Sequence, residues 1–175
     1  SNYIPITQIM MIIGTISLMG FPFTSGYYSK DAIIESAYIS NSLFADYAYI
    51  LLTVGVVMTS FYSWRLMFLV FNGETRMSEE DYRKVHESSS IMLIPLILLA
   101  IGALFFGFLF KGYFIGYYSD SFWNNSIVVH HLDHDSIPLL IYYLPAFLGI
   151  VGFFIAWSMY CLLYTSDAAD ELRSV

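Results

Sequence analysis

The sequence predicts an all-α protein, a polytopic transmembrane helical bundle of about four spans with the first one broken. The 175-residue chain is 58% hydrophobic and 19% aromatic with only 12% charged residues, which is more apolar surface than a soluble domain of this size can bury. Long apolar runs recur along it, and glycine and proline interrupt the first of them. The net charge of −7 disfavours nucleic acid as a partner.

The first span covers about residues 4–40 and is too long to be one straight helix. At 1.5 Å per residue it would extend roughly 50 Å, against a hydrocarbon core of about 30 Å. Gly20, Pro22 and Gly26 are residues that end one helix and let another begin. Non-helical backbone at membrane depth is tolerated only beside protein or a water-filled cavity. The break therefore predicts an internal polar path.

Three charged residues follow this break: Lys30, Asp31 and Glu35. Lys30 lies roughly 15 Å inside the span, where a cation costs about 3 kcal/mol and usually faces a bundle interior or a hydrated path. The alternative is that its long side chain snorkels to the interface. The two acids and the half-helix ends created by the break favour a position of Lys30 inside the bundle.

Three further spans are predicted over residues 47–71, 90–110 and 137–160, and together with the first they define a membrane region at 1–160. Arg65 lies about six residues before the end of the second span. It either snorkels or pairs with an acid inside the bundle, and the sequence does not separate the two.

The loops predict the orientation of the chain. The loop between the second and third spans carries three basic residues, Arg76, Arg83 and Lys84. The loop between the third and fourth spans has only Lys111, at its edge. By the positive-inside rule the first of these loops is cytoplasmic, or on the matrix side in a mitochondrion. Lys30 then lies in the outward half of the first span.

A histidine-rich turn in the other loop suggests a metal site at first sight. It contains His130, His131, Asp133, His134 and Asp135. Adjacent His130 and His131 cannot share one helical face, and no further ligand set is present in the sequence. We therefore predict a solvated turn and no metal.

The C-terminal stretch CLLYTSDAADE, from Cys161, matches the translation of a transposase-end adapter used in sequencing libraries. We expect residues 161–175 to be a non-native tail, with an ordinary polar tail as the alternative. Cys161, the only cysteine, then carries no information about redox compartment.

Three segments carry a resemblance to a known family. They are GFPFTSGYYSKDAII (residues 20–34), TSFYSWRLMFLVFNGE (59–74) and HESSSIMLIPLILLAIGALFFGF (86–108). They resemble the large antiporter-like subunit of respiratory complex I, NADH:quinone oxidoreductase subunit L/chain 5. Within the resemblance, Lys30 matches the lysine of the family's discontinuous helix, Asp31 the acid beside it, and Arg65 an arginine at the end of the next helix. Glu35 matches no family site, so its role rests on position.

The resemblance implies a proton-translocating membrane subunit of NADH:quinone oxidoreductase that carries part of the outward proton pathway. No cofactor is then expected in this chain, because NAD, FMN, iron–sulfur clusters and quinone belong to other subunits. The expected partners are other complex I membrane subunits and the lipid bilayer. The hydrophilic loops look most like those of alphaproteobacterial members of the family, so the resemblance implies a bacterial inner (plasma) membrane, with the mitochondrial inner membrane as the alternative.

Two other functions stay open. A subunit of a multisubunit cation/proton antiporter or a membrane hydrogenase shares the broken helix and the lysine. A membrane scaffold without transport would not need Lys30 at all.

Overall fold

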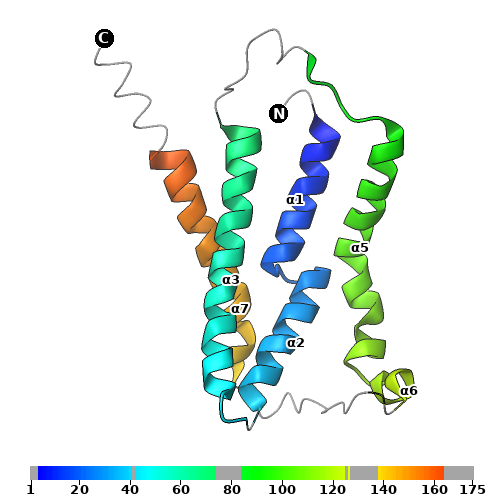
Figure 1. The fold of residues 1–175 in the computed structure, drawn as a ribbon, viewed down its shortest axis with the longest axis vertical. Coiled ribbons are helices and arrows are strands. Elements are labelled where there is room, and N and C mark those ends of the chain that lie inside the picture. The colour runs from blue at the N-terminus through cyan, green and yellow to red at the C-terminus, as the bar shows by residue number, and fades with distance from the viewer. Residues whose placement is uncertain (1–3, 41, 74–83, 125, 127–137, 164–175) are drawn as a thin grey trace.

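The chain folds as a bundle of helices in a computed structural model that describes residues 4–40, 42–73, 84–124, 126 and 138–163 (Figure 1). In chain order the helices are α1 (Pro5–Met19), α2 (Ser25–Ile39), α3 (Ala45–Met67), η1 (Phe68–Asn72), α5 (Ser90–Phe114), α6 (Ser119–Trp123), α7 (Leu139–Trp157) and η3 (Ser158–Leu163). The described residues contain no strand. The predicted all-α transmembrane bundle is confirmed.

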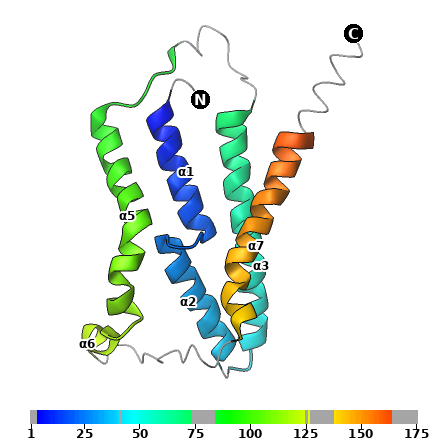
Figure 2. The ribbon, with the colours of Figure 1, turned by 180° about the vertical axis from the view of Figure 1, so that it is seen from behind.

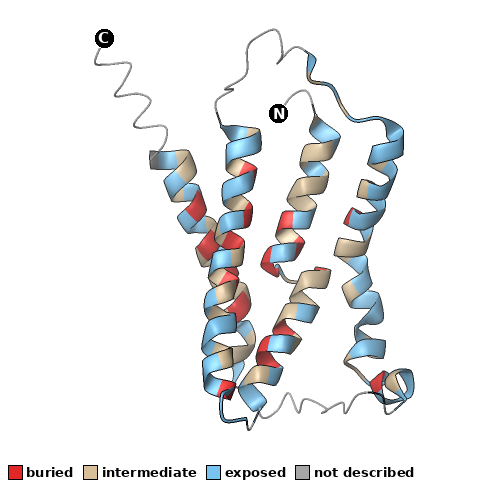
Figure 3. Cartoon of the chain, in the orientation of Figure 1, coloured by how far each residue is buried: buried red, intermediate tan, exposed pale blue. Residues whose placement is uncertain are grey.

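In the part of the chain that the structure describes, three helical stretches are long and apolar enough to cross a membrane: Ala45–Asn72, Ser90–Phe114 and Leu139–Leu162. α1 is a shorter apolar helix. Most side chains on α3, α5 and α7 are exposed or only partly buried within this chain (Figure 3). Apolar surface on this scale needs lipid or neighbouring helices to cover it.

α1 and α2 stack end to end in the middle of the bundle (Figures 1 and 2). α3 and α7 pack against them on one side, and α5 lies on the other. The two half-helices together span the height that α3 spans alone, and both make contacts with α3 and α5. The break between them is therefore enclosed by other helices.

The break begins at Gly20, which has a φ of 82° and ends α1 in the left-handed conformation. Its N–H bonds the Ser17 carbonyl and the next N–H bonds Ile16, so two carbonyls at the end of α1 are satisfied. Phe23 also has a positive φ, 71°, which is unusual for a bulky residue. The Thr24 hydroxyl donates to the Phe21 carbonyl at 2.7 Å and holds this turn before α2 starts.

Small residues bring α3 and α7 into close contact. The Ser60 side chain is fully buried and donates a 2.6 Å hydrogen bond to the Gly149 carbonyl. A Cβ on Gly152 would lie 2.7 Å from the Val57 carbonyl oxygen. Helix pairs in membranes commonly use this combination of small side chains and interhelical hydrogen bonds.

α5 is longer at its C-terminal end than the predicted span, since it continues through Phe114. Lys111 is therefore part of a helix and not of a loop. The histidine-rich turn at 130–135 lies outside the described residues, as does most of the expected adapter-derived tail, residues 164–175. Both expectations stay predictions.

Candidate functional site

Lys30 is half-buried on α2, and its side chain turns back toward the end of α1. The ammonium donates a 2.9 Å hydrogen bond to the Leu18 carbonyl. This carbonyl belongs to the last turn of α1, the negative end of the helix dipole, where a cation is favoured. The break thus supplies a backbone acceptor for a charge that lipid would not solvate.

A cavity of about 450 Å³ lies beside Lys30, between α2 and α3. Its lining is mostly apolar and includes Leu51, Leu52 and Val56 of α3, with the Thr59 hydroxyl as a polar group. The Lys30 ammonium is therefore hydrogen-bonded to α1, while the residue lines a mostly apolar cavity together with α3.

Asp31 and Glu35 are the most deeply buried charged groups among the described residues, at 6% and 4% exposed. They are four residues apart and share one face of α2. Both carboxylate oxygens of Asp31 are buried without a hydrogen-bond partner among the described residues, although the Tyr27 side chain is close enough to interact with it. A buried carboxylate in this state is costly unless nearby cations or a bound proton compensate.

The two acids line a small cavity of about 70 Å³ together with side chains from two other helices. Lys111 comes from α5 and Tyr142 from α7. The charges of Lys30, Glu35 and Lys111 all act on Asp31. The sequence prediction missed both Lys111 and Tyr142. The signal available for Lys111 was its place directly after a uniformly apolar run, with an aromatic stretch following it.

Arg65 is not part of this cluster. It lies near the opposite end of α3, is exposed, and places its guanidinium over the Tyr160 ring at 5.6 Å from the ring centre. Of the four predicted site residues, the structure places Asp31 and Glu35 in one cavity, puts Lys30 on the same helix beside another cavity, and leaves Arg65 apart. Cation–π contact with Tyr160 is a third arrangement that the sequence did not suggest.

The break is joined to α5 by two serine hydroxyls. Ser25, the first residue of α2, donates to the Gly102 carbonyl at 2.8 Å and accepts from the Gly107 N–H at 2.6 Å. Ser17 of α1 donates to the Ala103 carbonyl at 3.2 Å. These α5 groups are directed to α1 and α2, so the middle of α5 is hydrogen-bonded to both sides of the break.

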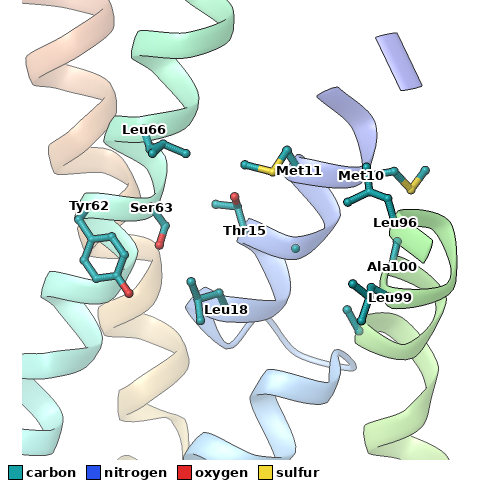
Figure 4. A pocket seen from close by; sticks show the side chains of 12 residues that line it. Met10, Met11, Thr15, Leu18, Tyr62, Ser63, Leu66, Leu96, Leu99 and Ala100 are labelled. Carbon is teal, nitrogen blue, oxygen red and sulfur yellow. The ribbon is translucent and has the colours of Figure 1, made fainter. Parts of the chain in front are cut away.

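A third cavity, of about 390 Å³, lies on the other side of the break among α1, α3 and α5 (Figure 4). Methionine and leucine side chains dominate its wall, including Met10, Met11 and Leu99, and its polar groups are hydroxyls such as Thr15 and Ser63. None of the described residues that line it is charged. Within the first span, the described charged residues therefore all lie in its α2 half.

Within the described ranges, no group of three or more His, Cys, Asp or Glu residues is placed to hold a metal ion. What the arrangement can do instead is hold and move a proton. It contains one lysine on a helix end, two adjacent buried acids, and a second lysine on the facing helix.

Comparisons with known proteins support the resemblance seen in the sequence. Residues 1–62 match the family described as NADH:quinone oxidoreductase/Mrp antiporter, TM. The chain is 43% identical over 162 residues to NADH-ubiquinone oxidoreductase chain 5 of Phytophthora infestans, covering 90% of this chain and 24% of that protein. The protein of the same name from Chondrus crispus is 38% identical over 184 residues, with 99% and 28% covered. That of Marchantia polymorpha is 39% identical, with 91% and 24% covered.

The chain thus spans about a quarter of the length of the curated relatives it matches. These relatives are eukaryotic and point to the mitochondrial inner membrane, so the expected bacterial plasma membrane is wrong. Span length and loop charge follow the same physical rules in both membranes, and for that reason they could not separate the two. The side expected to carry the basic loop is accordingly the matrix side.

Proposed function

We propose that this chain is a segment of the antiporter-like chain 5 of mitochondrial NADH:ubiquinone oxidoreductase, and that it carries part of an outward proton pathway. The observation that carries the proposal is the position of Lys30, hydrogen-bonded to the end of α1 and next in sequence to the buried Asp31. The names of the similar proteins support the same function.

The geometry suggests an order in which the side chains would pass a proton. A proton held by Lys30 has Asp31 as its nearest acidic neighbour along α2, and Glu35 lies one turn further toward the outward end. While Lys30 holds its proton, the ammonium has the Leu18 carbonyl as a hydrogen-bond acceptor. Tyr27 and Tyr142 flank the acids and provide hydroxyls that can take part in the transfer. The small volume of this cavity limits it to very few water molecules.

The redox reaction would take place elsewhere. We propose that NAD, FMN, iron–sulfur clusters and quinone are held by other subunits, and that this chain contributes proton transfer alone. The apolar faces of α3, α5 and α7 suit contact with lipid and with other membrane subunits of the complex.

A cation/proton antiporter subunit remains the second candidate, because the matching family covers both kinds of protein by its description. The relatives named chain 5 favour the oxidoreductase. A scaffold without transport is the third candidate, and it predicts that Lys30 can be replaced without consequence.

The test is Lys30→Met in the full-length subunit of an assembled complex, reconstituted into vesicles. Proton uptake driven by NADH is followed beside the rate of quinone reduction. We expect fewer protons moved per electron with the complex still assembled. Lys84→Met, which removes an exposed cation outside the spans, is the matched control. An unchanged ratio in Lys30→Met would mean that the lysine has only a structural role.

A further inference from the structure

Lys111 is the one lysine or arginine of α5, and although its side chain is exposed within this chain, it lines the small cavity beside Asp31 and Glu35. It lies three residues before the end of that helix, in a place where a lysine commonly snorkels to the membrane surface. Its ammonium nevertheless contacts an aromatic side chain of α2. It sits over the Tyr28 ring, 5.2 Å from the ring centre.

The Tyr28 ring fixes the direction in which Lys111 points. A Cβ on Gly107 would lie 3.0 Å from Cδ2 of Tyr28, so this ring packs against α5 one turn before Lys111. The lysine side chain is therefore turned back toward the break and away from Phe114, where α5 ends. Favourable contact with an aromatic face helps to hold a cation there.

The same side chain lines the cavity that contains the two acids, and its charge acts on Asp31. The charges of Lys30 and Lys111 thus act on Asp31 from two different helices. Lys30 is engaged by the Leu18 carbonyl at the end of α1. Lys111 has no such fixed acceptor among its described contacts, which are the Tyr28 ring and the cavity wall.

We propose that Lys111 is a positioning residue for proton transfer: its charge sets how readily the Asp31–Glu35 pair accepts a proton from Lys30 and passes it outward. This inference rests on the proposed function. The physical reason is that two neighbouring carboxylates in a poorly solvated site cannot both stay charged without compensating cations. Lys111 provides such compensation from α5.

The test uses Lys111→Met and Lys111→Arg in the full-length subunit of the assembled complex, with protons moved per electron and the pH profile of pumping as readouts. We expect Lys111→Met to slow proton transfer roughly fivefold or more, because fivefold is the lower end of the coupling between two sites. The pH profile of pumping should shift as well. Lys111→Arg keeps the charge and should restore most of the ratio. All values are normalised to assembled complex.

A double-substitution cycle separates a role through the acids from a general loss of packing. If Lys111 acts through Asp31, then adding Lys111→Met to Asp31→Asn changes pumping no further. Full additivity of the two changes would overturn the proposal, as would normal pumping in Lys111→Met. If Lys30→Met abolishes pumping and Lys111→Met does not alter it, only this inference fails. If Lys30→Met is also silent, the proposed function fails with it.

Discussion

The Lys30 ammonium and the Leu18 carbonyl oxygen lie 2.9 Å apart, so a side chain of α2 closes the end of α1 across the break. The contact depends on the turn between them. Gly20 occupies a left-handed conformation there, and a Cβ on it would lie 3.5 Å from Cδ of Lys30. The lysine stem therefore packs along the turn that its head group stabilises.

Replacing Gly20 with alanine should destabilise the protein by about 1–2 kcal/mol, because an L-residue with a Cβ is strained at a φ of 82°. The measurement is the thermal unfolding midpoint of the detergent-solubilised complex. Gly14→Ala is the matched control, since Gly14 is inside α1 and nothing lies within 4 Å of an added Cβ. That change should be neutral or stabilising by about 0.5–1 kcal/mol. Equal losses in both variants would contradict a special role for the turn.

Removing the Ser25 hydroxyl should weaken the attachment of the break to α5. Ser25→Ala leaves the Gly102 carbonyl and the Gly107 N–H without this partner, at a cost of about 1–2 kcal/mol. Hydrogen exchange at the Gly107 amide should become faster. Ser29→Ala is the control, because the Ser29 hydroxyl bonds carbonyls of its own helix. Unchanged exchange at Gly107 in Ser25→Ala would rule out the attachment.

The break and the unusual position of Lys30 could be predicted from the sequence because both depend on residues close together in the chain. Gly20 and Pro22 interrupt a span that is too long, and a lysine within such a span needs a special environment. The acceptor of Lys30 could not be read in the same way. It is a backbone carbonyl twelve residues earlier, and only the angle between α1 and α2 brings it within reach.

The place of Lys111 beside the acids could not be predicted from the sequence. A lysine at the end of an apolar run resembles an interfacial residue, and its pattern contains no information about the neighbouring helix. Its place beside the acids follows from the close approach of α5 to α2. Gly107 makes that approach possible, since a Cβ there would lie 2.4 Å from the Ser25 Cα.

Stability should fall at acidic pH because of Glu87, which lies before α5 and outside the spans. Hydrogen bonds from the Thr7 hydroxyl, and from the Ile6 and Thr7 amides, hold the pKa of Glu87 below its ordinary value of 4.5. A carboxyl group whose pKa is lowered in the folded state stabilises the fold at pH values above the pKa that the group has in the unfolded chain. That contribution is lost as the pH falls through the folded pKa.

Thermal midpoints at pH 7 and near pH 4 would test this linkage. Glu87→Gln should lower the midpoint at pH 7 and reduce the difference between the two pH values, because the charged cap of α1 is gone. Asp46→Asn removes an exposed acid from the first turn of α3 and is the matched control. A pH difference as large in Glu87→Gln as in the unaltered protein would assign the acid sensitivity to other carboxyl groups.

The α3–α7 contact should tolerate no side chain at Gly152. A Cβ there would meet the Val57 carbonyl oxygen at 2.7 Å and the Ser60 Cβ at 2.8 Å, and the first of these is backbone that cannot turn away. Gly152→Ala should therefore separate the helices and destabilise the protein by about 1–3 kcal/mol. The thermal midpoint and the amount of assembled complex report the change. Gly55→Ala places the same methyl group on α3 with nothing within 4 Å, so it should preserve both readouts. If the two alanines behave alike, α7 is held by its apolar surface and not by close contact at Gly152.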